Sequence, residues 1–163
     1  MCEPGDVLRS LELTDAGWIY EACQDAEIQR WTLVPRPYLR EHAESFVRDG
    51  AGEFRNWVID LGGERPVGMI GVHTVENGVA SFGYWVAPWG RGRGAASGAV
   101  RAVIDELRAL GGVVALTANI AQANVPSRRT VETCGFTVSR ALPLASRDNG
   151  LAVDAVEYRL DLG

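Results

Sequence analysis

Hydrophobic residues recur at every second position in some stretches of this chain and at every third or fourth in others. Residues 7–13 alternate apolar and polar side chains, as a half-buried strand does. A helix is predicted to open at Thr14, because Trp18, Ile19 and Ala22 then follow at helical spacing. Residues 31–38 carry two prolines and are expected to be loop or extended chain. A second helix is predicted over about residues 39–48.

Three strand patterns follow, near residues 55–61, 66–75 and 79–86. Asn77-Gly78 separates the last two, and both residues accept a positive φ at little cost. This dipeptide predicts a tight hairpin. The three strands are therefore expected to be consecutive and antiparallel.

The pattern then changes to strand, glycine-rich turn, long helix and strand. The turn spans residues 88–94, and apolar residues then repeat at helical spacing until Gly111-Gly112. Residues 113–118 form a compact apolar strand pattern. This order predicts a βαβ unit, whose two strands run parallel.

A further helix is predicted over about residues 125–133, and strands over about 136–144 and 152–160. These two strands are joined across residues 147–150. The 163 residues make one domain's length of chain, with no internal repeat or linker. The predicted class is α+β, with one mixed sheet, helices packed on it and a single domain over residues 1–163.

Composition excludes several classes of protein. The formal net charge of -5 argues against wholesale binding of nucleic acid or anionic membranes. Three cysteines without a CxxC pair suggest neither a disulfide framework nor a zinc site, and only two histidines make a metal site improbable. No run approaches the roughly 20 apolar residues of a membrane helix, and the first residues lack the pattern of a signal peptide. A cytoplasmic protein without a metal is expected.

The acidic average hides one basic segment. Residues 88–130 contain six arginines against two carboxylates. This segment surrounds the glycine-rich turn, so its charge suits one small phosphorylated cofactor rather than a large polyanion.

The glycine-rich turn, residues 91–96, joins a strand to a helix. A helix begins with unpaired N–H groups and the positive end of its dipole, and glycines let such a backbone approach a phosphate closely. Arg91 and Arg93 add charge where an anion would lie. A tight turn with merely solvated arginines explains the same residues equally well. A third interpretation takes the Arg-Gly repeat as a nucleic-acid contact. The turn matches neither the P-loop nor the dinucleotide-binding pattern.

Four motifs in order nevertheless resemble the GNAT superfamily of acetyl-CoA-dependent N-acyltransferases, within it the RimJ/RimL group. They are the strand-ending Gly83-Tyr84-Trp85, the turn Arg91-x-x-Gly94-x-Ala96, the helix start Asn124-x-x-Ser127 and the helix-ending Gly135-Phe136. The resemblance covers nearly the whole chain. It implies a GNAT-like sheet of about six to seven strands, mostly antiparallel, with helices on both faces. It also implies a pair of parallel strands that splay apart and bind the cofactor.

The resemblance further implies that acetyl-CoA donates an acetyl group to a primary amine, by direct attack of the amine on the thioester. The amine belongs to a protein N-terminus or a small molecule. The residues that match the family's cofactor contacts lie on the strand end, the turn and the next strand–helix connection. They are Trp85, Val86, Arg91, Gly92, Arg93, Gly94, Ala95, Ala96, Asn119 and Asn124.

Ser127 is the catalytic candidate on the thiol side. Many relatives protonate the departing thiolate with a Tyr four residues before the glycine of Gly-Phe, but this chain has Val131 there. The RimJ/RimL-like alternative is the Ser of Asn-x-x-Ser. A Ser near a helix start is also a common helix cap, and the two roles are compatible.

The sequence indicates the general base less clearly than the donor to the thiolate. Similar sequences often carry a Glu two residues before the Gly of Gly-Tyr-Trp, where this chain has Ser81. His73 titrates in a useful range, although a lone strand His is more often structural, and Glu53 and Glu76 are weaker candidates. The residues expected to face the amine are Trp31, Tyr38, His73, Ser81 and Tyr84.

Because Ser81 and Val131 depart from the family's pattern, the alternative function is a non-catalytic acyl-CoA-binding module with the same fold. The sequence does not identify the amine. A monomer and a homodimer are equally compatible with these residues.

Overall fold

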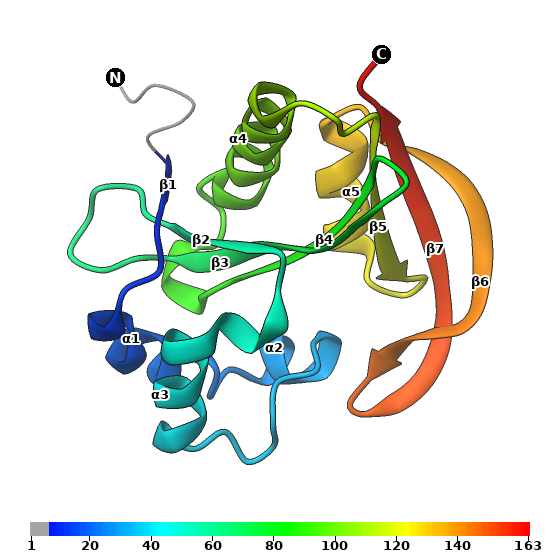
Figure 1. The fold of residues 1–163 in the computed structure, drawn as a ribbon. Coiled ribbons are helices and arrows are strands. Elements are labelled where there is room, and N and C mark those ends of the chain that lie inside the picture. Colours follow the sequence, from blue (N-terminus) through cyan, green and yellow to red (C-terminus); the bar gives the residue numbers. More distant parts are fainter. Residues whose placement is uncertain (1–6) are drawn as a thin grey trace.

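The strands form one seven-stranded mixed sheet, and the helices pack on both of its faces (Figure 1). The computed structural model describes residues 7–163, so Cys2 lies outside the described residues. The strand order is β1-β2-β3-β4-β5-β7-β6. The strands are β1 (Leu8–Arg9), β2 (Arg55–Ile59), β3 (Gly68–Glu76), β4 (Val79–Val86), β5 (Ala115–Ala121), β6 (Thr137–Asp148) and β7 (Leu151–Asp161). The helices are α1 (Ala16–Ala22), α2 (Ala26–Trp31), α3 (Arg40–Asp49), α4 (Ala95–Leu110) and α5 (Val125–Thr133), with short 3-10 helices η2 (Leu13–Asp15), η3 (Gly50–Gly52) and η4 (Pro88–Gly90).

The predicted antiparallel half of the sheet is confirmed. β2, β3 and β4 pair in sequence, and Asn77 and Gly78 both have positive φ in the turn between β3 and β4. The strand predicted over residues 7–13 is mostly wrong, because only Leu8 and Arg9 pair with β2. Beyond Arg9 the chain turns into η2, and the alternating pattern ends with an exposed Leu13.

The predicted βαβ unit is also confirmed: α4 connects β4 to β5, and these strands are parallel. In Figure 1, α4 and α5 lie above the sheet and α1, α2 and α3 lie below it. Val100 and Leu107 of α4 are buried against the upper face with Phe82. Ile19 and Met69 belong to a second core on the lower face. Successive residues of β4 therefore point alternately to the two helix layers.

Helix α2 was not predicted. Asp25 caps it, because its carboxylate accepts a hydrogen bond from the Ile28 backbone N–H at 3.1 Å. Trp31 ends this helix, so the sequence analysis was wrong to assign it to loop or extended chain. An acidic cap with another carboxylate, Glu27, in the first turn was the signal that could have revealed the helix.

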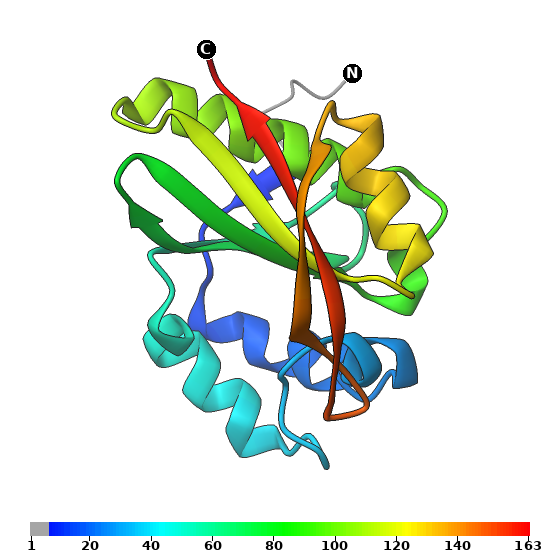
Figure 2. The ribbon, with the colours of Figure 1, turned by 90° about the vertical axis from the view of Figure 1, so that its right-hand side faces the viewer.

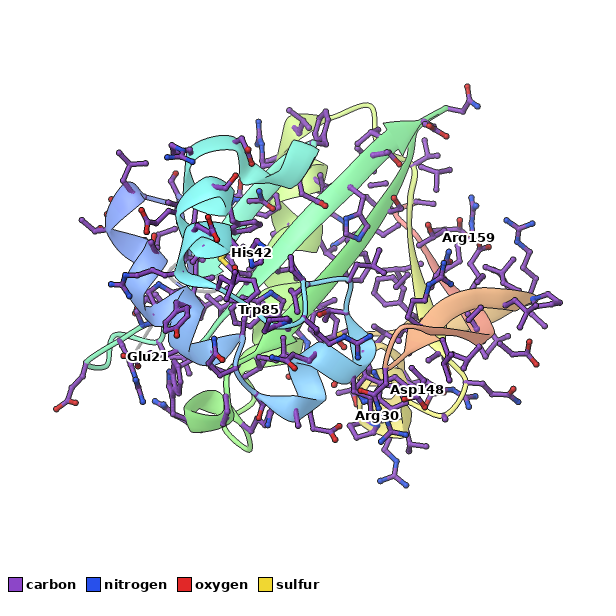
Figure 3. The ribbon with its side chains drawn as sticks, turned by 90° about the horizontal axis from the view of Figure 1, so that it is seen from below. Glu21, Arg30, His42, Trp85, Asp148 and Arg159 are labelled. Atoms are coloured by element: carbon purple, nitrogen blue, oxygen red, sulfur yellow. The ribbon has the colours of Figure 1, made fainter. Side chains whose placement is uncertain are left out.

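The C-terminal hairpin extends further than predicted and closes on α2. Its turn has positive φ at Asn149 and Gly150, as the turn residues suggest. The Asn149 N–H donates to the Arg30 carbonyl at 2.9 Å, and the Arg30 guanidinium contacts both carboxylate oxygens of Asp148 at 2.8 and 3.1 Å. Figure 2 shows the hairpin crossing the molecule toward α2, and Figure 3 shows Arg30 beside Asp148.

Candidate functional site

The two parallel strands separate halfway along their length. β4 and β5 are paired only over Val79 to Ser81 and Ala115 to Thr117. β4 continues to Val86 and β5 to Ala121, but their facing edges are no longer paired with each other. Their ends are held by β3 on one side and β7 on the other. The splayed pair implied by the family resemblance is therefore present in the fold.

A pocket of about 520 Å³ lies where β4, the glycine-rich turn and the start of α4 meet. Gly92 and Gly94 have φ of 75° and 73°, and a Cβ added at either would meet no atom within 4 Å. These two glycines are therefore required by backbone conformation rather than by space. Gly90 differs, because its Cβ would lie 2.4 Å from that of Val67.

The first turn of α4 lines this pocket with Ala95, Ala96 and Ser97. The N–H groups of a first helical turn have no partner within the helix, and the helix dipole is positive there. The pocket is therefore suited to a phosphate group.

The two arginines of the turn differ in their surroundings. Arg91 lines the pocket, but its guanidinium also forms an ion pair with Asp25 at 2.5 Å. Burial alone would raise the pKa of Asp25, but the hydrogen bonds from Arg91 and the Ile28 backbone lower it below its usual value. Arg91 thus links the turn to the cap of α2. Arg93 is exposed and does not line the pocket.

A second, wider cavity of about 1040 Å³ lies on the lower side of the sheet, between the parted strands, α3 and the tip of the C-terminal hairpin. It shares six lining residues with the phosphate-suited pocket: Trp31, Thr32, Tyr84, Trp85, Asn124 and Ser127. The two spaces therefore meet where β4 and β5 have separated. Trp85 lies at the centre of the lower face (Figure 3).

Asn124 and Ser127 lie at the start of α5 and divide the expected roles between them. Asn124, not Ser127, caps the helix, and its Oδ1 accepts from the Ser127 N–H at 3.4 Å. The Ser127 hydroxyl instead hydrogen-bonds the Tyr84 hydroxyl at 2.9 Å. Interpretation of Ser127 as the cap is therefore wrong. Ser127 lines both cavities.

The Tyr84 ring packs against the upper core, and its hydroxyl contacts Ser127 where the two cavities meet. Burial raises its pKa above the usual value, although hydrogen bonds with Ser127 and Thr130 lower it. The phenol is thus held as a proton-bearing group. Val131 has no exposed surface and belongs to the core, so nothing polar stands at the position where many relatives have a Tyr.

His73 and Glu53 contact each other in the wall of the wider cavity. His73 Nδ1 lies 2.6 and 2.8 Å from the two carboxylate oxygens of Glu53. Both residues line the cavity. Ser81 also lines it, and its hydroxyl hydrogen-bonds that of Thr74 at 3.0 Å. Sequence reasoning gave Glu53 only as a weak candidate for the base. The contact was not predictable, because the two residues are twenty positions apart and no local pattern marks such a pair.

The predicted cofactor residues mostly gather around the narrower pocket. Trp85, Val86, Arg91, Gly92, Gly94, Ala95, Ala96 and Asn124 line it. Asn119 lines the wider cavity instead, and Arg93 lines neither.

All five predicted acceptor residues line the wider cavity. Sequence reasoning missed its other charged members, Asp49 and Arg147. These two lie at the end of α3 and near the hairpin tip, positions that no local motif marks.

The comparisons with known proteins agree with this geometry. The family model for the acetyltransferase (GNAT) domain matches residues 7–137, and the chain belongs to this family. A search of the curated proteins gave no match.

Solved structures with the same fold include RimJ from Mycobacterium smegmatis in complex with a coenzyme A disulfide. It has a TM-score of 0.84 and 21% identity, and the match covers 95% of this chain and 81% of that one. RimL, an alpha-N-protein acetyltransferase in complex with coenzyme A, has a TM-score of 0.83 and 17% identity over 94% and 92% of the two chains. A spermidine N-acetyltransferase from Vibrio cholerae, in complex with coenzyme A and spermine, has a TM-score of 0.81 and 19% identity over 94% of each chain. The resemblance to the GNAT superfamily and to the RimJ/RimL fold is therefore confirmed.

Within residues 7–163, no helix has the length and apolar character needed to cross a membrane. The same residues contain no cluster of three or more His, Cys, Asp or Glu side chains that could hold a metal ion.

Proposed function

We propose that this protein transfers an acetyl group from acetyl-CoA to a primary amine, by direct attack of the amine on the thioester. The observation that carries the proposal is the meeting of two cavities at the parted strands. One suits a phosphate-bearing cofactor, and the other is wide enough for a separate acceptor. Membership of the acetyltransferase (GNAT) family supports the same reaction.

In this proposal the backbone N–H groups of residues 91–96 hold the pyrophosphate of coenzyme A, and the pantetheine follows the unpaired edge of β4. Such an edge offers N–H and C=O groups to an extended ligand, as a neighbouring strand would. Asn124 lies beside this path, and Trp85 and Val86 line it. A backbone N–H near Trp85 or Val86 polarises the thioester carbonyl and stabilises the oxyanion that develops on it.

Ser127 then serves the departing thiolate, with Tyr84 as its hydrogen-bond partner. The neutral amine attacks the carbonyl carbon, the C–S bond breaks, and the sulfur leaves with the bonding electrons. The Ser127 hydroxyl gives its proton to the sulfur. It recovers one, through the Tyr84 hydroxyl or water, from the amine nitrogen, which loses a proton as it becomes an amide. The 2.9 Å contact between the two hydroxyls supports this pairing.

The acceptor class stays open between two kinds of amine. RimL is an alpha-N-protein acetyltransferase, and the Vibrio cholerae enzyme is a spermidine N-acetyltransferase. Both kinds of acceptor are cationic before reaction. The wider cavity is lined by two carboxylates, those of Asp49 and Glu53, and by one guanidinium, that of Arg147, and this balance favours a cationic ligand in either case.

The test combines calorimetry with release of free thiol from acetyl-CoA. Micromolar binding of coenzyme A, and thiol release with at least one of a panel of N-terminal peptides, polyamines, amino acids and small amines, is the expected result. Binding of coenzyme A without acylation of any amine would instead support the acyl-CoA-binding module. Salt-dependent binding of nucleic acid, weakened by Arg91→Ala and Arg93→Ala, would support the third interpretation.

A further inference from the structure

His73 has one ring nitrogen held by a carboxylate and the other turned to the sheet surface. Glu53 lies between η3 and β2, twenty residues before His73, and its oxygens contact Nδ1 at 2.6 and 2.8 Å. The Glu53 side chain is 19% exposed and that of His73 is 49% exposed. The carboxylate is therefore the buried member of the pair and the imidazole the accessible one.

Two features of the sheet create the place where this pair lies. The first is an irregularity in the pairing of β3 with β4: Val72 faces Phe82 and Thr74 faces Ser81, so His73 has no partner of its own. An extra residue of this kind redirects its side chain. The result is that His73 is brought over β4.

The second feature is a bare patch formed by Gly71 and Gly83, which face each other across β3 and β4. A Cβ at Gly83 would lie 2.8 Å from His73 Nε2. One at Gly71 would lie 2.6 Å from Asn56 Oδ1 and 3.1 Å from a Glu53 carboxylate oxygen. The imidazole thus occupies the space over Gly83, and the Glu53 carboxylate shares the space over Gly71 with the Asn56 amide.

The patch lies next to the point where the reaction is proposed to occur. Ser81 is the last residue of β4 that pairs with β5. Gly83 comes two positions after Ser81 and two positions before Trp85. All three point to the lower face of the sheet and line the wider cavity. His73 Nε2 therefore stands beside the opening between the strands, on the side from which an acceptor arrives.

We propose that His73 is the catalytic base for the incoming amine and that Glu53 is its positioning residue; this inference rests on the proposed function. The Glu53 carboxylate accepts a hydrogen bond from Nδ1–H, which fixes the tautomer in which Nε2 carries a lone pair. Nε2 takes one proton from the ammonium group of the acceptor. The neutral nitrogen attacks the thioester carbon, and the C–S bond breaks. The amine's second proton replaces the one that the Ser127 hydroxyl has given to the thiolate, and His73 returns its proton to water.

The pair would supply the function that Ser81 cannot supply. A serine hydroxyl is too weakly basic to deprotonate an ammonium group, and the Ser81 hydroxyl is already bonded to Thr74. Other charged and titratable groups of the cavity come from the elements around it. They are Tyr38, His42 and Asp49 from the α3 region, Tyr84 from β4 and Arg147 from the hairpin.

His73→Gln is the first test, with kcat/KM measured from pH 6 to 10. The expected loss at pH 7 is about 10²- to 10⁴-fold, the usual contribution of a general base. In the variant only the free amine reacts, so its rate should rise about tenfold for each pH unit up to the pKa of the amine, and the deficit should shrink accordingly. Affinity for coenzyme A should stay within about twofold of the wild-type value.

Glu53→Gln tests the positioning role. The amide keeps the shape and can still accept from Nδ1, but it lacks the charge that favours the imidazolium. kcat should therefore fall while KM for the amine and the affinity for coenzyme A stay within about threefold of the wild-type values, a split that a general structural loss would not cause. Glu106→Gln is the matched control: Glu106 is exposed on α4 and lines neither cavity, and the kcat and KM of this variant should match those of the wild type.

The outcomes separate the two proposals. Turnover by the wild type, with an unchanged rate and profile in His73→Gln, overturns the base and leaves the proposed function standing. A loss that is equal at every pH, or one accompanied by lost affinity for coenzyme A, also overturns the base. Absence of turnover by the wild type with every amine overturns both.

Discussion

At the scale of single residues, one missing Cβ atom decides where His73 can lie. In a Gly83→Ala variant the new methyl carbon would stand 2.8 Å from His73 Nε2, so the ring must move. A displacement of about 1 Å in a catalytic group costs on the order of 100-fold in rate. We expect a loss of about that size in kcat, with coenzyme A affinity preserved, measured by thiol release and calorimetry.

Gly17→Ala provides the control for the same substitution. A Cβ at Gly17 meets nothing within 4 Å, and the residue lies in α1. Alanine in a helix should stabilise the protein by about 0.5–1 kcal/mol without changing the rate. Full activity in Gly83→Ala would show that the position of His73 is irrelevant to turnover.

The hydroxyl pair of Ser127 and Tyr84 gives a second residue-scale prediction. Ser127→Ala should lower kcat by about 10²-fold or more while coenzyme A affinity changes little, because the donor to the thiolate is lost. Ser139→Ala, on the exposed part of β6, should leave kcat unchanged. A wild-type rate in Ser127→Ala would reduce Ser127 to a structural partner of Tyr84.

The pH dependence of this step follows from burial of Tyr84. Its raised pKa keeps the phenol protonated through neutral and moderately alkaline pH. The hydroxyl pair should therefore retain its proton up to about pH 10, the ordinary value for a Tyr, and beyond it. If kcat decreased with rising pH already before pH 9, and this decrease were absent in Tyr84→Phe, the assignment would be contradicted.

The sequence predicted the chemistry of these residues better than their partners. Ser127 and Asn124 were both recognised, because a motif fixes their spacing along one helix. The structure was needed to show that Asn124, and not Ser127, caps the helix. It was also needed to show that the Ser127 hydroxyl bonds Tyr84, which lies on a strand forty-three positions away in the sequence. The same limit applies to Glu53, since an ion pair between distant segments leaves no periodic trace in a sequence.

At the scale of elements, local rules succeeded wherever a pattern was long or a turn had a required conformation. The Asn77-Gly78 hairpin and the long amphipathic helix α4 are confirmed for this reason. Short elements were the failures. β1 pairs through two residues only, and α2 spans a single stretch of six. In elements of this length tertiary contacts outweigh the local pattern.

The joint between β4 and α4 carries the element-scale prediction. Gly94→Glu and Gly94→Ala both force a side chain onto a residue with φ of 73°, at a cost of about 1–2 kcal/mol each. Only the glutamate brings a negative charge to the start of α4, where the pyrophosphate is proposed to bind. We expect coenzyme A affinity to fall at least 100-fold in Gly94→Glu and only a few-fold in Gly94→Ala, by calorimetry. Equal affinities in the two variants would show that the pyrophosphate does not bind at this turn.

At the scale of the whole molecule, contacts between distant segments give the wider cavity its shape. Arg30 of α2 and Asp148 of β6 form a partly buried two-point ion pair. Arg91 joins the glycine-rich turn to Asp25 at the other end of the same helix. Helix α2 is thus tied to both the cofactor side and the acceptor side. The family resemblance predicted both sides of the site, but it did not predict the helix that connects them.

A local hydrogen-bond network around Asp15 joins β1 to the start of the lower helix layer and gives a prediction about the stability of the whole molecule. Asp15 is 2% exposed and accepts hydrogen bonds from Arg9 of β1, from the Glu12 N–H and from the Trp18 indole at 2.7–3.0 Å. Burial alone would raise the pKa of Asp15, but these donors outweigh it and lower the pKa below its usual value. A lowered pKa means that the stabilisation is complete above the unfolded-state pKa of about 3.9 and is lost as pH falls through the folded-state value.

Asp15→Asn should therefore lower the free energy of unfolding by about 2 kcal/mol at pH 7, a figure below that of a fully buried pair because Arg9 is one-third exposed. The difference from the wild type should shrink on acidification below about pH 4, as the wild-type carboxylate becomes protonated. Asp60→Asn is the matched control, because it removes the other carboxylate that is paired with Arg9. The Asp60 side chain is 28% exposed, so this substitution should lower the free energy of unfolding by less than about 1 kcal/mol. Urea unfolding of the three proteins at pH 7 and at pH 3.5 measures each of these differences. A deficit in Asp15→Asn that is the same at both pH values would show that shape, and not the charge of Asp15, anchors the helix layer that forms the floor of the acceptor cavity.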